Sequence, residues 1–127
     1  MYSALRHDGG PYIIRYPRGC GAGVEWKEKP FSLIGNGRGE KLLGGSRAAI
    51  LTIGPMAGMA LEAATAVKEN TGISPAVYDM RFLKPLDGDI IREVSSMEYI
   101  VTVEDGALKG GLFSAVSEAL ASLPSKP

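Results

Sequence analysis

The sequence contains a single cysteine, Cys20, and a single histidine, His7, among 127 residues. One cysteine excludes an internal disulfide, which fits a reducing compartment such as the cytoplasm. His7 has no second His or Cys at ligand spacing, so no metal site is expected. A Ser-His-Asp or Cys-His arrangement is not evident either. Function classes that depend on such clusters are therefore not expected in this stretch of chain.

Neither charge sign is in excess, and long hydrophobic runs are missing. Fourteen basic and fourteen acidic side chains give a formal net charge of zero. We therefore expect no nucleic-acid partner and no anionic-membrane partner. No apolar run approaches the roughly 20 residues of a membrane span, and the first ten residues lack the apolar core of a signal peptide. The sequence predicts a cytoplasmic globular protein.

Hydrophobic patterning predicts alternating strands and helices over most of the chain. Continuous apolar runs predict buried strands at about 48–53, 76–80 and 99–103. Helices are expected over residues 55–72, 88–97 and 112–123, with Asp87 as the cap of the second. Alternating strands and helices give parallel strands joined by right-handed crossovers. The predicted fold class is α/β, with a mostly parallel sheet flanked by helices.

Three further predictions concern segments with less regular patterns. The run "PYIIRY", residues 11–16, has continuous apolar residues and predicts a strand buried on both faces. Residues 31–45 are typical of strand, turn and strand. The turn "GNGRG" at 35–39 fits a hairpin better than a phosphate loop, because no helix and no Lys-Ser/Thr pair follow it. The helix over 55–72 is expected to show water only one narrow polar face.

Two arginines, Arg15 and Arg18, flank Pro17 in "RYPRG". Proline fixes its own φ and disfavours helix at Tyr16, so the arginines lie on a bend. A guanidinium is a planar fork that suits phosphate or carboxylate. Spacing alone favours a basic turn in which the arginines pair with carboxylates of the protein. The alternative is an anion-binding site.

The carboxyl ends of parallel strands form the edge at which such sheets bind ligands. Arg81 and Lys84 follow one predicted strand, and a plain basic loop and a binding role are equally compatible with them. Glu104 and Asp105 follow another strand, shortly before a helix. A carboxylate hydrogen-bonded to backbone amides is the favoured interpretation there, because acidic residues oppose anion binding at a helix N-terminus.

Four strings occur in a fixed order: "YIIRYPRG" (12–19), "AAILTIGPM…ALEAA" (48–64), "VYDMRFLKPLD" (77–87) and "IVTVEDGALKGGLFSAV" (100–116). Together they resemble the C-terminal part of the 1-deoxy-D-xylulose-5-phosphate synthase family, thiamine-diphosphate enzymes of the transketolase superfamily. "RYPRG" with "RFLKPLD" is the specific part of the match. The last string is similar also to the β subunit of 2-oxo-acid dehydrogenases.

The resemblance implies a fold like the transketolase C-terminal domain, incomplete in this chain. It implies that residues 1–24 are the end of a pyrimidine-binding domain and that residues 25–127 are a truncated transketolase C-terminal domain. The full-length enzyme would be a homodimeric transferase with small-molecule substrates, using thiamine diphosphate and Mg²⁺. It would condense pyruvate with glyceraldehyde 3-phosphate to 1-deoxy-D-xylulose 5-phosphate plus CO₂, a precursor of isoprenoids, thiamine and pyridoxal.

The resemblance also assigns site residues. Arg18 matches the family's arginine that holds the phosphate of the aldehyde substrate, and Arg15 is its neighbour in the motif. The family's "GDG…N" magnesium and diphosphate motif, its activating glutamate and its thiazolium histidines are absent from the sequence. We therefore expect a fragment with no catalytic, cofactor-binding or metal-binding residue of its own, and no synthase activity in isolation.

Two alternatives stay open at this point. One is a stand-alone binding or regulatory module of the transketolase C-terminal type. The other is a β subunit of a 2-oxo-acid dehydrogenase, which "RFLKPLD" disfavours. The sequence departs from the synthase pattern at "VEDG", where many relatives have "VEEN", and at Cys20, which replaces a common Asn.

Overall fold

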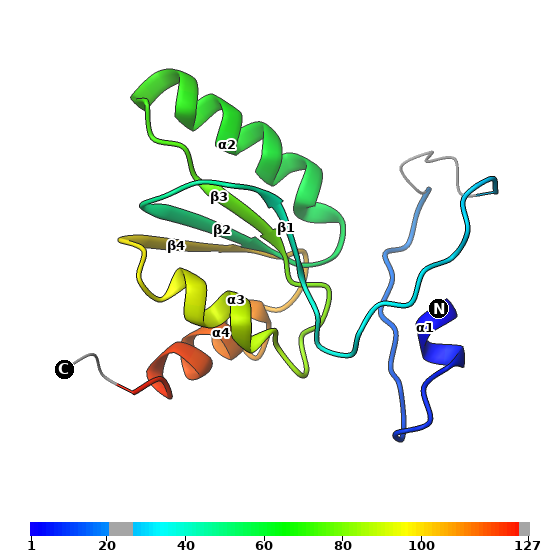
Figure 1. The fold of residues 1–127 in the computed structure, drawn as a ribbon. Helices are drawn as coiled ribbons and strands as arrows, with labels where there is room; N and C mark the ends of the chain where they lie inside the picture. Colours follow the sequence, from blue (N-terminus) through cyan, green and yellow to red (C-terminus); the bar gives the residue numbers. More distant parts are fainter. Residues whose placement is uncertain (21–26, 125–127) are drawn as a thin grey trace. The chain divides into compact units, whose positions relative to one another are not determined.

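The computed structural model describes residues 1–20 and 27–124 (Figure 1). The chain divides into two compact units, Met1–Gly35 and Asn36–Pro127. The predicted boundary between a pyrimidine-binding domain and a C-terminal domain, at residues 24 and 25, stays a prediction. Two glycines that follow "RYPRG" in the sequence, Gly21 and Gly23, lie outside the described residues.

In its described part, the first unit contains one short helix, α1 (Tyr2–Leu5), which ends before the Gly9–Gly10 pair. Its ring at Tyr2 stacks on Phe31 with ring centroids 5.6 Å apart. The backbone N–H of Ile34 donates to Ser3 Oγ at 2.9 Å. None of the described residues of this unit is buried. The first unit therefore has no hydrophobic core within its described part.

The strand predicted over residues 11–16 is wrong. These residues belong to no strand or helix, and Ile13 is 92% exposed. A strand buried on both faces needs a neighbouring strand and covering elements, and none of the strands in the described residues pairs with this run. Its apolar sequence shows that the segment favours burial, but it does not show what buries it.

The second unit is built on a four-stranded sheet in the order β1-β3-β2-β4 (Figure 1). Its strands are β1 (Glu40–Leu43), β2 (Ala48–Thr52), β3 (Ala76–Asp79) and β4 (Tyr99–Val103). The central β2 pairs in parallel with β3 and β4, and β1 pairs antiparallel with β3. The predicted α/β fold with a mostly parallel sheet is confirmed.

Helices cover both faces of this sheet. A short 3-10 turn, η1 (Gly54–Met56), leads into α2 (Ala57–Thr71), and α3 (Gly88–Val94) and α4 (Leu112–Ala121) follow β3 and β4. Figure 1 shows α2 on one face and α3 with α4 on the other. Among the described residues, no helix has the length and apolar character needed to cross a membrane.

The core has two parts, one on each face of the sheet. The larger part lies between the sheet and helices α3 and α4, with Leu51, Tyr78 and Ile91 among its buried members. The smaller part lies under α2 and is formed by Ile50, Val77, Ala60 and Ala64. The buried strand residues alternate between the two parts, because successive side chains of a strand point to opposite faces.

The prediction that α2 exposes only one narrow face is wrong. Only Ala60 and Ala64 of this helix are buried, whereas Met59 is 61% and Val67 is 38% exposed. The helix packs mainly over β2 and β3. Its apolar surface is therefore wider than the part of the sheet that it contacts.

The hairpin predicted over residues 31–45 is also wrong. Residues 31–35 form no strand, and β1 pairs with β3 instead of with a neighbouring segment. Gly37 has a φ of +69° and lies against Pro85, so the glycine-rich segment turns toward the loop that precedes α3. Turn residues fix a local change of direction, but they do not fix which strand becomes the partner.

Candidate functional site

The two predicted phosphate-binding residues, Arg15 and Arg18, lie in the first unit and are both exposed. Arg18 makes no hydrogen bond or ion pair with another described residue. Gly19 follows it with a φ of +145°, a backbone conformation that residues with a side chain rarely adopt. An exposed guanidinium next to glycine is accessible to an anion, and its phosphate role stays a prediction.

Arg81, after β3, fastens two parts of the protein together. Its guanidinium forms an ion pair with Glu40 of β1, and its backbone N–H donates to Asp79 Oδ1 at 3.0 Å. Its φ of +54° turns the chain sharply at the end of β3. Lys84, in the same loop, is exposed. Of the two interpretations of this loop, the structure supports a structural one for Arg81.

Glu104, after β4, holds the start of α4. Its Oε1 accepts the backbone N–H of Phe113 at 3.2 Å. Gly111 leaves room for this carboxylate, because a Cβ at that position would lie 2.2 Å from Glu104 Oε2. The favoured interpretation of a carboxylate bonded to a backbone amide is confirmed. A hollow of about 510 Å³ next to it is lined by Val103, Leu108 and Phe113, among others.

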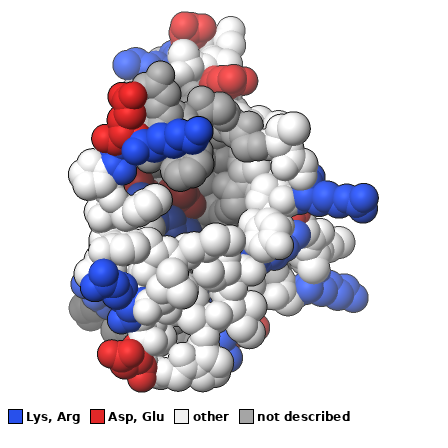
Figure 2. All heavy atoms as spheres, turned by 90° about the vertical axis from the view of Figure 1, so that its right-hand side faces the viewer, with Lys and Arg blue, Asp and Glu red and all other residues white. Residues whose placement is uncertain are grey.

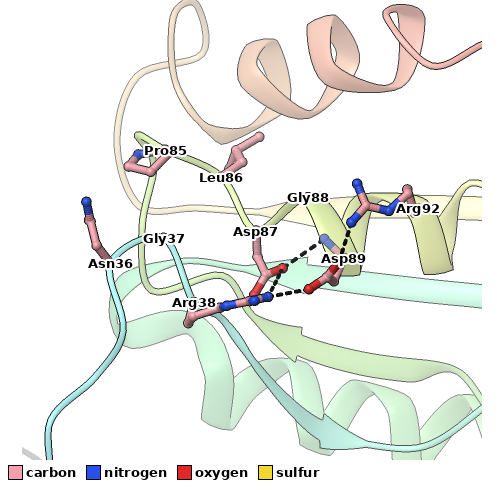
Figure 3. Close-up of a pocket in the computed structure, with 9 residues that line it drawn as sticks. All are labelled: Asn36, Gly37, Arg38, Pro85, Leu86, Asp87, Gly88, Asp89 and Arg92. Carbon is pink, nitrogen blue, oxygen red and sulfur yellow. Dashed lines mark hydrogen bonds and ion pairs between the residues drawn. The ribbon is translucent and has the colours of Figure 1, made fainter.

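A charged cleft that the sequence did not reveal lies between the segment before β1 and the start of α3 (Figure 3). It has a volume of about 320 Å³ and is lined by Asn36, Gly37, Arg38, Pro85, Leu86, Asp87, Gly88, Asp89 and Arg92. Arg38 and Arg92 approach Asp89 from two sides and both pair with it (Figure 3). The sequence contains one signal for this cleft, the glycines Gly37 and Gly39 on either side of Arg38. They let this segment lie close to Pro85 and Ile90.

Asp87 lies at the centre of the cleft and is only 5% exposed. Its Oδ1 accepts the N–H groups of Asp89 at 2.9 Å and Ile90 at 3.3 Å, which caps α3 as predicted. Its Oδ2 accepts the N–H of Gly39 at 3.0 Å. Arg38 adds an ion pair to Oδ1 at 3.5 Å. One buried carboxylate therefore joins the segment before β1 to the start of α3.

The charges of the cleft satisfy one another. Hydrogen bonds from Arg38 and Arg92 hold the pKa of Asp89 below its usual value, and Asp89 in turn raises the pKa of Arg38. Two guanidiniums face two carboxylates, so the cleft presents no net charge to a ligand. Its ion pairs and hydrogen bonds hold the segment before β1 against the start of α3.

A second polar cluster involves Lys41 of β1 itself. Lys41 Nζ lies 2.5 Å from Glu93 Oε1 of α3 and 5.5 Å from the ring centroid of Tyr78. Tyr78 is fully buried, and its hydroxyl has no hydrogen-bond partner among the described residues. Burial raises the pKa of Tyr78, and the hydrogen bond from Lys41 lowers the pKa of Glu93. The ion pair of Lys41 with Glu93 therefore connects β1 to α3.

Acidic and metal-ligating side chains are dispersed over the described residues. Over residues 1–20 and 27–124, no three His, Cys, Asp or Glu side chains lie together as metal ligands. Figure 2 shows Lys, Arg, Asp and Glu interspersed with uncharged residues on the face that it displays.

The arrangement of four strands, one helix on one face and two on the other, coincides with a known domain type. Residues 37–125 match the family model of the transketolase, C-terminal domain. This range covers every strand and all helices from η1 to α4. The chain belongs to the transketolase C-terminal domain family.

Within that superfamily, the chain is similar to one particular enzyme over nearly its whole length. It is 48% identical over 122 residues to the 1-deoxy-D-xylulose-5-phosphate synthase of Bacteroides fragilis, covering 95% of this chain and 19% of the relative. The synthase of Chlorobium luteolum is 46% identical over 127 residues, covering 99% of this chain and 20% of the relative. The resemblance predicted from the sequence is confirmed, and the chain spans about a fifth of the length of these curated relatives.

A solved structure agrees with this placement. It is described as a split gene transketolase, inactive beta4 tetramer, and it matches with a TM-score of 0.66 at 38% identity. The match covers 71% of this chain and 30% of the solved chain. The transketolase-like fold is confirmed by this likeness.

Proposed function

We propose that this chain works as the C-terminal-domain part of a 1-deoxy-D-xylulose-5-phosphate synthase. That enzyme is a transferase that condenses pyruvate with glyceraldehyde 3-phosphate and releases CO₂. The observation that carries the proposal is the identity of 45–48% to synthases over nearly all of this chain, including its first unit. A match limited to the second unit would support only the wider transketolase superfamily.

Within this function, Arg18 binds the phosphate of glyceraldehyde 3-phosphate, and Arg15 assists it. Both arginines belong to the exposed segment around Pro17, and Arg18 has no carboxylate partner among the described residues. A guanidinium that is not paired with a protein carboxylate keeps its donors for a phosphate dianion. Arg38, Arg81 and Arg92 are unsuited to this role, because each pairs with a carboxylate of the protein.

The chain alone is proposed to be inactive. Thiamine diphosphate, with Mg²⁺, supplies the carbanion chemistry of the complete enzyme. Among the described residues, no group of three His, Cys, Asp or Glu side chains could hold the metal ion. The complete enzyme is proposed to be a cytoplasmic homodimer whose products feed isoprenoid, thiamine and pyridoxal synthesis.

A separately encoded subunit is the second candidate. One observation favours it: the solved structure of similar fold is described as a split gene transketolase that forms a beta4 tetramer. In that case, the chain would act beside a second polypeptide that supplies the catalytic residues. "RYPRG" and "RFLKPLD" remain the features that favour the synthase.

A chimera tests the proposed function directly. The matching fifth of the Bacteroides fragilis synthase is replaced by this chain, and formation of 1-deoxy-D-xylulose 5-phosphate from the two substrates is measured. The proposal predicts product formation by the chimera and none by the isolated chain. A folded, homodimeric chimera without activity contradicts the proposal, and so does product formation by the chain alone. Should the chimera not fold, the chain is supplied in trans to the relative truncated at the same point, with the same two expectations.

A further inference from the structure

The segment Asn36–Leu43 is here named the strap. It begins with the residues before β1 that line the charged cleft, continues through β1, and follows directly on the first unit in the sequence. Its strand β1 lies at an edge of the sheet as the described residues form it, next to β3. The ladder between the two is short, and its register shifts between Lys41 and Leu43. Edge strands with few hydrogen-bonded neighbours open more readily than central strands.

The charged side chains of the strap all pair with the same region of the second unit. Arg38 pairs with Asp89, Glu40 with Arg81, and Lys41 with Glu93. These are ion pairs between largely exposed side chains, which contribute little each and are screened by salt. The seam between the strap and the segment from β3 to α3 is therefore fastened mainly by polar contacts.

Apolar contacts of the strap are few. Leu42 packs on the core under α2 as a partly buried residue, and Leu43 is 38% exposed. Gly37 and Gly39 bury no side chain, although both fit closely: a Cβ at Gly39 would lie 2.6 Å from Ile90 Cδ1. Releasing the strap exposes much less apolar surface than unfolding the domain, so it requires less free energy.

Asp87 is a buried polar side chain that joins the two sides of the seam. Its Oδ1 accepts the N–H groups at the start of α3 and also forms an ion pair with Arg38 of the strap at 3.5 Å, and its Oδ2 accepts the N–H of Gly39 at 3.0 Å. Hydrogen bonds to a charged acceptor are stronger than neutral ones. Oδ1 therefore caps the helix and pairs with a strap side chain, whereas Oδ2 holds the strap backbone.

We propose that the strap is a releasable element that detaches from β3 and α3 without global unfolding, and that Asp87 is the clip that holds it. Release converts a docked segment into free chain next to the first unit. It lengthens the connection between the two units by up to about 27 Å, at roughly 3.4 Å per extended residue. It also uncovers the hydrogen-bonding edge of β3. The first unit carries Arg15 and Arg18, so the strap sets the length of chain that tethers these arginines to the second unit.

Native-state hydrogen exchange of the full chain, followed by NMR, tests the proposal without any activity measurement. In the unaltered protein, the Gly39 amide is expected to exchange at least tenfold faster, after correction for intrinsic rates, than the slowest amides of the central strand β2. Raising the salt concentration from about 0.05 to 0.5 M should speed exchange at Gly39 and leave β2 unchanged.

The variant Asp87→Asn separates the clip from the cap. Asparagine caps helices as well as aspartate, so its oxygen can still accept the amides of Asp89 and Ile90. Its NH₂ group cannot accept the N–H of Gly39. We expect exchange at Gly39 to rise by about tenfold or more, with the Ile90 amide changed less than about threefold. Glu98→Gln, which removes the ion pair of Glu98 with Arg47 away from the strap, should leave Gly39 unchanged.

Two results would overturn the proposal. In the first, Gly39 and the β2 amides of the unaltered protein exchange with the same opening equilibrium, which means that the strap opens only with the whole domain. In the second, Asp87→Asn leaves Gly39 exchange unchanged or alters only the Ile90 amide, which removes the clip role from Asp87.

Discussion

Gly45 offers the sharpest test of how the strap region joins the rest of the sheet. A Cβ at this position would lie 2.3 Å from the Ser74 carbonyl oxygen, 2.3 Å from the Pro75 carbonyl carbon and 2.4 Å from the Ala76 nitrogen. All three are backbone atoms at the start of β3, so no side chain can rotate away. The neighbouring Ser46 N–H donates to the same Ser74 oxygen at 2.9 Å.

Gly45→Ala must therefore push the connection between β1 and β2 away from β3. Overpacking costs about 1–3 kcal/mol, and weakening the Ser46 hydrogen bond adds about 1 kcal/mol. We expect the free energy of unfolding to fall by about 2–4 kcal/mol. For a unit of this size, that lowers the melting temperature by at least about 8 °C.

Gly44→Ala is the matched control, because a Cβ at Gly44 would meet no atom within 4 Å. Its free energy of unfolding should stay within about 0.5 kcal/mol of the unaltered chain. Thermal and urea unfolding, followed by circular dichroism, measure both variants. Equal stabilities of the two variants would refute the packing argument at Gly45.

Three further perturbations follow from the same contacts. Three exposed carboxyls have pKa values lowered by paired Arg or Lys side chains: Asp89, Glu93 and Glu98. The stabilisation from these ion pairs is complete above the ordinary pKa values of 3.8 for Asp and 4.5 for Glu, and it is lost as the pH falls through the lowered values. The midpoint of urea unfolding should therefore drop between about pH 5 and pH 3. A constant or rising midpoint contradicts this. Tyr78→Phe removes a buried hydroxyl that has no hydrogen-bond partner among the described residues, so the free energy of unfolding in urea should stay level or rise by up to about 1 kcal/mol. A loss of that size would reveal a hydrogen bond. Glu104→Ala leaves the Phe113 N–H without its acceptor and should lower the free energy of urea unfolding by about 1 kcal/mol. Glu118→Ala, at an exposed position of α4, should change it very little. Equal effects of the two variants argue against the capping role of Glu104.

The parallel core of the second unit was predictable because buried parallel strands have a simple sequence signature. The runs around Ile50 and Val77 are continuously apolar, and helices separate them at the expected lengths. The Asp87 cap was also predictable, since a capping side chain contacts amides only two and three residues away. These features depend on local sequence alone.

The errors all concern contacts between distant segments. β1 pairs with β3, whose residues come more than thirty positions later, so the turn at 35–39 could not indicate the partner. The exposure of Met59 on α2 depends on how much of the sheet the helix covers, which periodicity does not report. The pairing of Arg38 with Asp89 likewise joins two segments that are far apart in sequence.

The site residues, unlike the parallel core, could not be assigned from local sequence alone. The glycine pattern around Arg38 indicated a turn, which lies at residues 36–37, and the structure adds the ion pairs of Arg38 with Asp87 and Asp89. Arg15 and Arg18 were chosen because of a resemblance to a family, since their spacing alone favoured an ordinary basic turn. The structure adds that Arg18 is exposed and has no carboxylate partner among the described residues.

The phosphate assignment of Arg18 is tested most directly by substrate-specific kinetics in the chimeric synthase. Arg18→Ala should raise the KM for glyceraldehyde 3-phosphate by about tenfold or more, the cost of a lost charge-assisted hydrogen bond, and change the KM for pyruvate less than about twofold. Arg18→Lys should recover part of the loss, and Arg6→Ala, at an exposed arginine over the Tyr2 ring, should leave both values unchanged. Equal increases for both substrates, or no increase for the phosphorylated one, would contradict the account.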